Sequence, residues 1–321
     1  MRKFVLPLLA FSILAAPLMA PKPARAEFGR YAFDFNVFTW KITKPEKKND
    51  DPLAPDAAPS KKPGDDPFML GKTDYLVGTM HFPVKPDEED VPGKLKKLLE
   101  RSTAFAMEAD LSTFNRQAVR KYLDLAPGQN LQLALPARTW QVLAANYAAK
   151  GVPPATLAHT KPWLLELMWA NTTRMGNGLD SYLRKIANRG GKRLYYLEGM
   201  EDQIRALDAG TFEERVDMLT HTVDDPEVQV DTLRAMMDSY KAGYLDSSRG
   251  LVFDEEMMRH YPVYYRELFD NRNAAWMPKV LDLMGKEDAV IAVGLGHLVG
   301  PGGLLQMLKD RGYTVEALPY E

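Results

Sequence analysis

Two histidines follow the same short motif near opposite ends of the chain. His81 and His297 each stand three residues after a glycine, Gly78 and Gly294, and each glycine ends a run rich in β-branched and aliphatic residues. Such runs predict buried strands, and open α/β sheets place ligand sites at the carboxyl ends of their strands. We therefore expect the fold to bring both imidazoles into one pocket, with the two glycines as further pocket positions.

The matching settings of the two histidines favour a chemical role. A single half-buried histidine is more often structural. A neutral imidazole is nevertheless a common metal ligand and the usual general base near neutral pH. Because the two residues lie far apart in the sequence, only the fold can bring them together, so their spacing alone indicates little.

Two glutamates also stand at the ends of predicted strands. Glu108 closes the buried run 103–109, and Glu198 follows the run 193–197. A carboxylate in this position is costly to bury without a partner. Two imidazoles with one or two carboxylates would form a divalent-ion site with open positions for water and substrate. An ion pair with a nearby Lys or Arg is the alternative for each glutamate, and it is favoured for Glu198.

Three further polar residues stand at the starts of predicted helices. Asp180 opens a helix, and its type fits an N-cap better than a catalytic position. Arg272 and Asn273 open the helix that contains Met277 and Met284. They could bind a carboxylate or a developing oxyanion, but from the residues alone solvated helix-start positions are favoured.

Composition limits the possible chemistry and partners. The 321 residues contain no cysteine, which excludes disulfides, thiolate metal ligands and a cysteine nucleophile. The formal net charge is -2, and it becomes -6 without residues 1–26, which contain four basic residues and no acid. A mildly acidic chain without basic clusters is a poor candidate for binding nucleic acid.

The N-terminus has the pattern of a secretory signal peptide. Arg2 and Lys3 precede an apolar run, 4–18, that is short for a membrane span, and a small-x-small cleavage pattern ends at Ala26. We expect bacterial Sec-type export, cleavage after Ala26, and a mature chain, 27–321, in the periplasm or outside the cell without membrane association. An uncleaved N-terminal anchor is the alternative.

The mature chain predicts one α/β domain. Both ends show the order strand, Gly-x-x-His, helix, strand, whereas the middle, about 112–285, is mostly helical. We expect a central mixed sheet built from two related α/β halves, with the helical middle as an inserted cap. Residues 44–72, rich in Pro, Lys and Asp, predict a flexible loop. The expected strands are 31–42, 75–78, 103–109, 193–197, 288–294 and 313–318, and the first expected helices are 116–124, 136–149 and 162–175.

A series of short motifs runs through the chain in a fixed order. They are Trp40-Lys41-Ile42, Tyr75 to His81, Ala106 to Leu111, Gly178-Leu179-Asp180, Leu197 to Gln203, Asn271-Arg272-Asn273, Val293 to Gly300 and Gly312 to Val315. In this order and separation they resemble the TraB/GumN family, which includes the Tiki proteins. The resemblance covers nearly the whole chain from about Phe38 onward.

The resemblance implies a metal-dependent hydrolase fold related to the erythromycin-esterase and haem-binding ChaN-like proteins. Tiki proteins are described as divalent-metal peptidases that use paired Gly-x-x-His motifs and a glutamate. Carried over residue by residue, this implies His81, His297 and Glu108 at the metal, with Arg272 and Asn273 matching another family motif.

The chain departs from the family pattern in two places. One is the 44–72 insertion, and the other is the run Glu198-Gly199-Met200, because Thr more often follows this Glu in the family. Neither departure involves the histidines. The second leaves the role of Glu198 open.

We therefore expect an exported metal-dependent hydrolase, most simply a peptidase that cleaves amide bonds with metal-activated water. The ion would be Mn²⁺, Co²⁺ or Zn²⁺, and Arg272 and Asn273 would steady the substrate carbonyl. Two alternatives stay open. One is a metal-free esterase in which the histidines and Glu108 act as acid and base, and the other is a protein that binds a peptide or haem without turnover. The partner is a peptide or another small molecule in each case.

Overall fold

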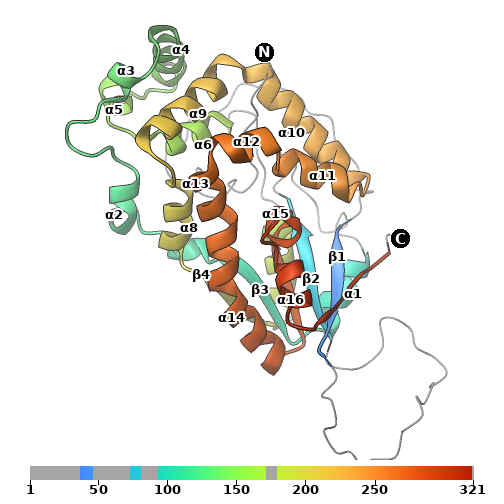
Figure 1. The fold of residues 1–321 in the computed structure, drawn as a ribbon. Helices are drawn as coiled ribbons and strands as arrows, with labels where there is room; N and C mark the ends of the chain where they lie inside the picture. The colour runs from blue at the N-terminus through green and yellow to red at the C-terminus, as the bar shows by residue number, and fades with distance from the viewer. Residues whose placement is uncertain (1–36, 46–72, 81–92, 171–178, 320–321) are drawn as a thin grey trace, which may run out of the picture.

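A six-stranded mixed sheet lies at the centre of the fold (Figure 1). The computed structural model describes residues 37–45, 73–80, 93–170 and 179–319. The strand order is β4-β3-β5-β2-β1-β6, with β4, β3, β5 and β2 parallel and β1 antiparallel to both of its neighbours. The predicted α/β class with a mixed sheet is confirmed. The strands are β1 Thr39–Thr43, β2 Asp74–Thr79, β3 Ala104–Ala109, β4 Arg193–Glu198, β5 Ala289–Gly294 and β6 Thr314–Ala317.

The strands that lead into the two Gly-x-x-His motifs are neighbours in this sheet. β2 and β5 pair in parallel, from Tyr75 opposite Val290 to Thr79 opposite Gly294. β3 pairs in parallel with β5 on its other side. Because parallel strands end at the same edge of a sheet, the ends of β2, β5 and β3 lie side by side. The expectation that both ends of the chain contribute to one sheet is therefore confirmed.

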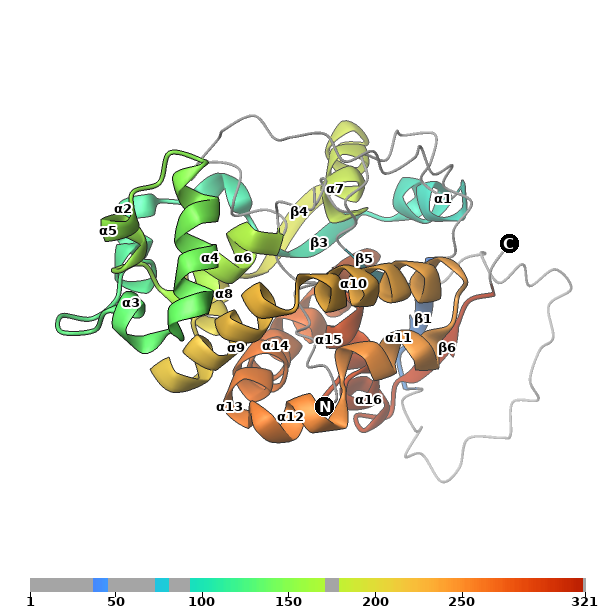
Figure 2. The ribbon, with the colours of Figure 1, turned by 90° about the horizontal axis from the view of Figure 1, so that it is seen from above.

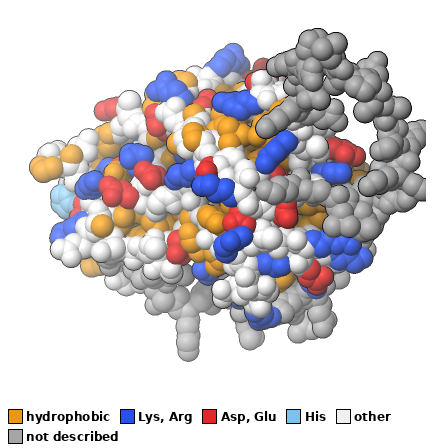
Figure 3. Space-filling model, turned by 90° about the horizontal axis from the view of Figure 1, so that it is seen from below, with side chains coloured by type: hydrophobic (Ala, Val, Ile, Leu, Met, Phe, Trp, Pro, Cys, Tyr) orange, Lys and Arg blue, Asp and Glu red, His pale blue; other side chains and the backbone are white. Residues whose placement is uncertain are grey.

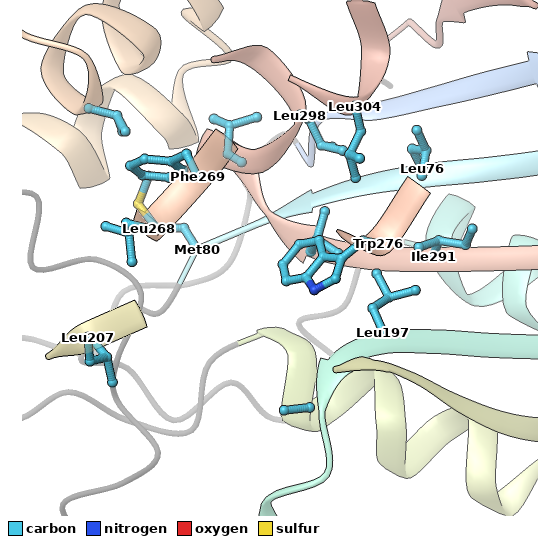
Figure 4. Close-up of a cluster of buried hydrophobic side chains, with 14 of the residues drawn as sticks. Leu76, Met80, Leu197, Leu207, Leu268, Phe269, Trp276, Ile291, Leu298 and Leu304 are labelled. Carbon is cyan, nitrogen blue, oxygen red and sulfur yellow. The ribbon is translucent and has the colours of Figure 1, made fainter. Parts of the chain in front are cut away.

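Helices cover both faces of the sheet (Figure 2). The face packed against α1 (Gly93–Arg101) and α7 (Leu179–Arg189) buries Val77, Phe105, Met107, Val290 and Ala292. The opposite face packs against α14 (Asn271–Lys286), α15 (Leu295–Val299) and α16 (Leu304–Lys309), and it buries Leu76, Ala104, Ala106, Ile291 and Val293 (Figure 4). Strand side chains alternate between faces. Glu108, two residues after Ala106, therefore projects towards the helices of the second face.

The other helices form a cap over one end of the sheet. Within it α3, α4 and α5 lie farthest from the strands (Figures 1 and 2) and share a core of their own with α6 and α9. The cap helices are α2 Arg116–Val119, α3 Leu131–Ala134, α4 Ala137–Ala148, α5 Pro154–Leu157, α6 Pro162–Ala170, α8 Met200–Leu207, α9 Phe212–Asp224, α10 Pro226–Lys241, α11 Leu245–Val252, α12 Glu255–His260 and α13 Pro262–Tyr265, followed by a π-helical turn, Arg266–Asp270.

The structure corrects two expected element boundaries. The helix expected over 116–124 is split into α2 and a 3₁₀ turn, Arg120–Tyr122. Residues 31–36 of the first expected strand, 31–42, lie outside the described residues, and in the part that is described this strand begins at Thr39 and not at 37. The predicted signal peptide, most of the 44–72 loop and His81 lie outside the described residues. In the part that is described, no helix combines the length and the apolar character needed to cross a bilayer.

The face seen from below carries charges of both signs. Lys and Arg side chains lie interspersed with Asp and Glu among apolar side chains there (Figure 3). A protein that binds nucleic acid usually presents a continuous basic surface. The described residues on this face do not form one.

A buried ion pair connects two helices of the cap. Arg215 of α9 donates from Nη2 to Glu166 Oε2 of α6 at 2.7 Å, and their side chains are 6% and 2% exposed. Glu166 Oε1 and Arg215 Nε make no hydrogen bond with any described residue. Burial raises the pKa of Glu166 to about 7, against the opposing charge of Arg215. The pair is therefore only partly satisfied.

Replacing Glu166 with glutamine is expected to flatten the pH dependence of stability. The pKa of Glu166 is higher in the folded chain, so the folded state binds more protons than the unfolded state between pH 4.5 and about 7. The free energy of unfolding of the unmodified protein should fall over this range by about 2 to 3 kcal/mol relative to Glu166→Gln. Urea unfolding at a series of pH values measures this difference, and two parallel profiles would contradict it.

Candidate functional site

The edge where β2, β5 and β3 end holds a buried polar cluster. Glu108 reaches it from β3, and the backbone N–H of Gly294 donates to Glu108 Oε1 at 2.8 Å. A Cβ at position 294 would lie 3.3 Å from the same oxygen. This contact is tight enough to require the carboxylate to shift, so glycine allows the close approach of strand and carboxylate.

His297 lies in α15, directly after β5, and is 2% exposed. Its Nδ1 is 2.8 Å from Asn273 Oδ1. The Asn273 amide nitrogen donates to the carbonyls of His297 and Gly302 at 3.3 and 2.9 Å, which leaves Oδ1 as the acceptor. Nδ1 of His297 therefore carries the proton, and Nε2 carries the lone pair.

Arg272 occupies the centre of the cluster. Its guanidinium forms a fork with Glu198, from Nη2 to Oε1 at 2.6 Å and from Nε to Oε2 at 3.1 Å. Nη2 also donates to Glu108 Oε2 at 2.7 Å, and Nη1 donates to His297 Nε2 at 2.9 Å. Because a guanidinium can only donate, this last contact supports the lone pair on Nε2.

The expectation that Arg272 and Asn273 are solvated is wrong. They are 5% and 1% exposed, although they do open α14 as predicted. The physical reason is the position of this helix start, which faces the ends of β3 and β4, where two carboxylates need a cationic partner. The ion-pair alternative therefore applies to both Glu108 and Glu198 in this structure, and one arginine serves both.

Electrostatics fix the charge states of the imidazole and the guanidinium. Burial and the charge of Arg272 lower the pKa of His297 to about 3, so the ring is neutral at neutral pH. Burial alone would lower the pKa of Arg272. The carboxylates of Glu198 and Glu108 outweigh this effect of burial and raise the pKa of Arg272. The cluster thus combines a neutral imidazole with a permanent cation.

Sequence reasoning missed two residues of the cluster. Trp276 donates from Nε1 to Glu198 Oε2 at 3.0 Å, and its ring lies 4.4 Å from that of His297 and 4.6 Å from the guanidinium carbon of Arg272. Gln203 donates to Glu108 Oε2 at 3.3 Å. The available signal was helical spacing, since Trp276 stands four residues after Arg272 and thus on the same face of the helix. Figure 4 shows the indole of Trp276 among apolar side chains that include Leu197 and Ile291.

Two other predicted pocket residues lie beside the cluster. Gly78 allows α15 to pack closely, because a Cβ there would lie 2.7 Å from the Leu295 side chain. Asp180 is one residue inside α7 rather than at its N-cap, and it accepts a hydrogen bond from Thr79 at 2.5 Å. It therefore binds the end of β2 and is not joined to Arg272 by a described contact.

The described segment that contains β2 ends at Met80, one residue before His81, and this end lies beside the cluster. Thr79 lies opposite Gly294 in the sheet. Met80 packs with Leu268 and Phe269 (Figure 4), and the ring of Phe269 is 5.2 Å from that of His297. The backbone up to Met80 therefore lies near His297. That His81 and His297 share one pocket stays a prediction.

The donor atoms of His297 and Glu108 fit a divalent ion. His297 Nε2 and Glu108 Oε1 are 3.9 Å apart, close enough for one ion to contact both at about 2.1 Å. The second nitrogen of a metal-bound histidine is usually held by an acceptor, as Asn273 holds Nδ1 here. The described residues contain no group of three His, Asp or Glu side chains arranged as an ion site. The predicted third ligand, His81, lies outside them.

The match to a protein family covers most of the chain. The model of the TraB/PrgY/gumN family matches residues 70–317. This range contains all strands of the sheet except β1 and every residue of the buried cluster. No solved structure is significantly similar to the chain.

Individual relatives are distant. YbaP of Escherichia coli, an uncharacterized protein, is 26% identical over 245 residues, which cover 73% of this chain and 87% of YbaP. The protein named metalloprotease TIKI2 of Danio rerio is 23% identical over 349 residues, covering 89% of this chain and 62% of that protein. A metalloprotease TIKI homolog of Nematostella vectensis is 24% identical, covering 75% and 64%. This chain thus spans less than two thirds of these TIKI proteins.

Proposed function

This chain belongs to the TraB/PrgY/gumN family, and on that premise we propose that it is a hydrolase that cleaves peptide or related amide bonds with a divalent metal ion. The names of the TIKI relatives, which are called metalloproteases, support the reaction class. We also propose that residues 1–26 direct export to the periplasm or the exterior.

One observation supports the metal-dependent form most directly. The lone pair of His297 Nε2 is directed into the cluster at 3.9 Å from a carboxylate oxygen of Glu108. A neutral imidazole and a carboxylate are the donors that Mn²⁺, Co²⁺ and Zn²⁺ accept. The low pKa of His297 keeps this nitrogen unprotonated at every physiological pH, and in this structure its lone pair accepts an N–H of Arg272.

The residues of the cluster have distinct proposed roles. Glu108 and His297 would hold the ion together with His81, and Glu108 is also the carboxylate placed to accept a proton from water. Asn273 orients His297, since its amide is fully engaged by His297 and Gly302. Arg272 places a positive charge where the substrate carbonyl develops negative charge. When bound, the ion supplies Lewis acidity, which polarises a carbonyl and acidifies water.

The test is peptide cleavage by the mature chain, 27–321, with and without a chelator. A peptide library read by mass spectrometry should show cleavage that the chelator abolishes and that Mn²⁺, Co²⁺ or Zn²⁺ restores. His297→Ala should lose both the activity and the bound ion, because it removes a ligand. His81→Ala should do the same if the predicted third ligand is correct.

The outcomes separate this proposal from its rivals. Ester hydrolysis that resists chelation would favour a metal-free esterase with the same residues. Tight binding of a peptide or of haem without turnover would favour a binding protein. A mature chain that neither binds an ion nor cleaves any peptide would refute the proposed function.

A further inference from the structure

The hydrogen bonds of Arg272 satisfy the same atoms that a metal ion would need. Five contacts leave the guanidinium, two to Glu198, one to Glu108, one to His297 Nε2 and one to the carbonyl of Leu268. The group is 5% exposed. A cation therefore already lies between the imidazole and the two carboxylates.

His297 Nε2 is the one atom that Arg272 and an ion cannot share. Its single lone pair accepts the N–H of Arg272, whereas a carboxylate oxygen has further lone pairs. Glu108 Oε1, for example, accepts the backbone N–H of Gly294 with one of its lone pairs. Ion binding at His297 thus requires Nη1 of Arg272 to leave Nε2.

The contacts of Glu198 allow Arg272 to leave Nε2 without losing its charge partner. The fork from Nε and Nη2 to Glu198 does not involve His297. Trp276 supports the same arrangement, because it donates to Glu198 and its ring lies 4.6 Å from the guanidinium carbon. In the described cluster two carboxylates share one arginine, and such an excess of acidic groups favours a second cation.

We propose that Arg272 is the resident cation of the site and that a divalent ion binds by displacing its guanidinium from His297, while Glu198 retains it. Arg272 thereby keeps the imidazole and Glu108 in place before the ion arrives, and it weakens ion binding by competing for Nε2. The inference rests on the proposed function, since it requires that the site takes an ion.

The test compares ion binding in two variants of Arg272. Arg272→Lys keeps the charge, but an ammonium cannot fork with Glu198 and reach Nε2 together. It should bind Co²⁺ or Mn²⁺ about tenfold more tightly by isothermal titration, because the ion no longer has to displace a hydrogen bond from a charged donor, and a bond of that kind corresponds to about a factor of ten in affinity. Arg272→Met removes the resident cation, so the same ion concentration should raise its melting temperature more than that of the unmodified protein.

Arg215→Met is the matched control. As a whole residue, Arg215 is 5% exposed, the same as Arg272. It is paired with Glu166 at 2.7 Å, but it lies in the cap. The ion should not raise the melting temperature of Arg215→Met more than that of the unmodified protein.

Three results would overturn the inference. The first is equal affinity in the unmodified protein and in Arg272→Lys. The second is equal ion stabilisation of Arg272→Met and Arg215→Met. If the unmodified protein binds an ion that His297→Ala does not, these results reject the competition and leave the proposed function standing. The third is an absence of ion binding in all variants, which would reject both.

Discussion

Replacing Arg272 with methionine is expected to lower the free energy of unfolding by roughly 3 to 5 kcal/mol. The side chain is 5% exposed and forms ion pairs with both Glu108 and Glu198, so its loss removes a buried cation that two carboxylates share. Methionine fills a similar volume, which limits any contribution from a cavity. Denaturant unfolding at neutral pH, without added metal, measures the change.

A double-mutant cycle shows whether charge is the cause. In a Glu108→Gln/Glu198→Gln background no carboxylates remain to be stranded, so the cost of Arg272→Met should shrink to roughly half or less. An unchanged cost in that background would attribute the effect to packing against Trp276 instead, and would contradict the electrostatic account.

The sheet was predictable because its strands carry their signals locally. The runs around Val77, Phe105 and Ile291 are continuously apolar, as expected for parallel strands that are covered on both faces, and each is buried between helix layers. The common edge of β2, β3 and β5 follows from the rule for parallel strands. The split helix at 116–124 was not predictable from periodicity, since apolar spacing does not fix where a helix tightens into a 3₁₀ turn.

The site was only partly predictable for a related reason. Strand ends identified Glu108, Glu198 and His297, because a strand end is visible in the sequence. The burial of Arg272 was not visible, since a helix start is normally solvated and becomes buried only through the strands it meets. Trp276 appeared as an ordinary core residue, and its hydrogen bond to Glu198 depends on the packing of α14 against β4. His81 stays a prediction.

The two carboxylates of the cluster are expected to differ sharply in their importance for activity. Glu108→Gln should lower kcat/KM for peptide cleavage by roughly 10² to 10⁴, with the fold largely intact. Glu108 is the more exposed carboxylate, at 12% against 5%, and the one that lies 3.9 Å from His297 Nε2. The neutral amide can neither accept a proton from water nor supply a charged ligand. Steady-state kinetics with a fluorogenic peptide selected from the library measure the loss.

Glu198→Gln is the matched control for this prediction, because it makes the same change one strand away. Both oxygens of Glu198 accept hydrogen bonds from the Arg272 fork and the Trp276 N–H, whereas the short distance to His297 Nε2 is made by Glu108. We expect a loss of stability, since the buried guanidinium loses its closest anion, and a fall in kcat/KM of only about tenfold, through the position of Arg272. The reverse order, with Glu198→Gln inactive and Glu108→Gln active, would mean that the reacting carboxylate belongs to β4 and that the assignment of Glu108 is wrong.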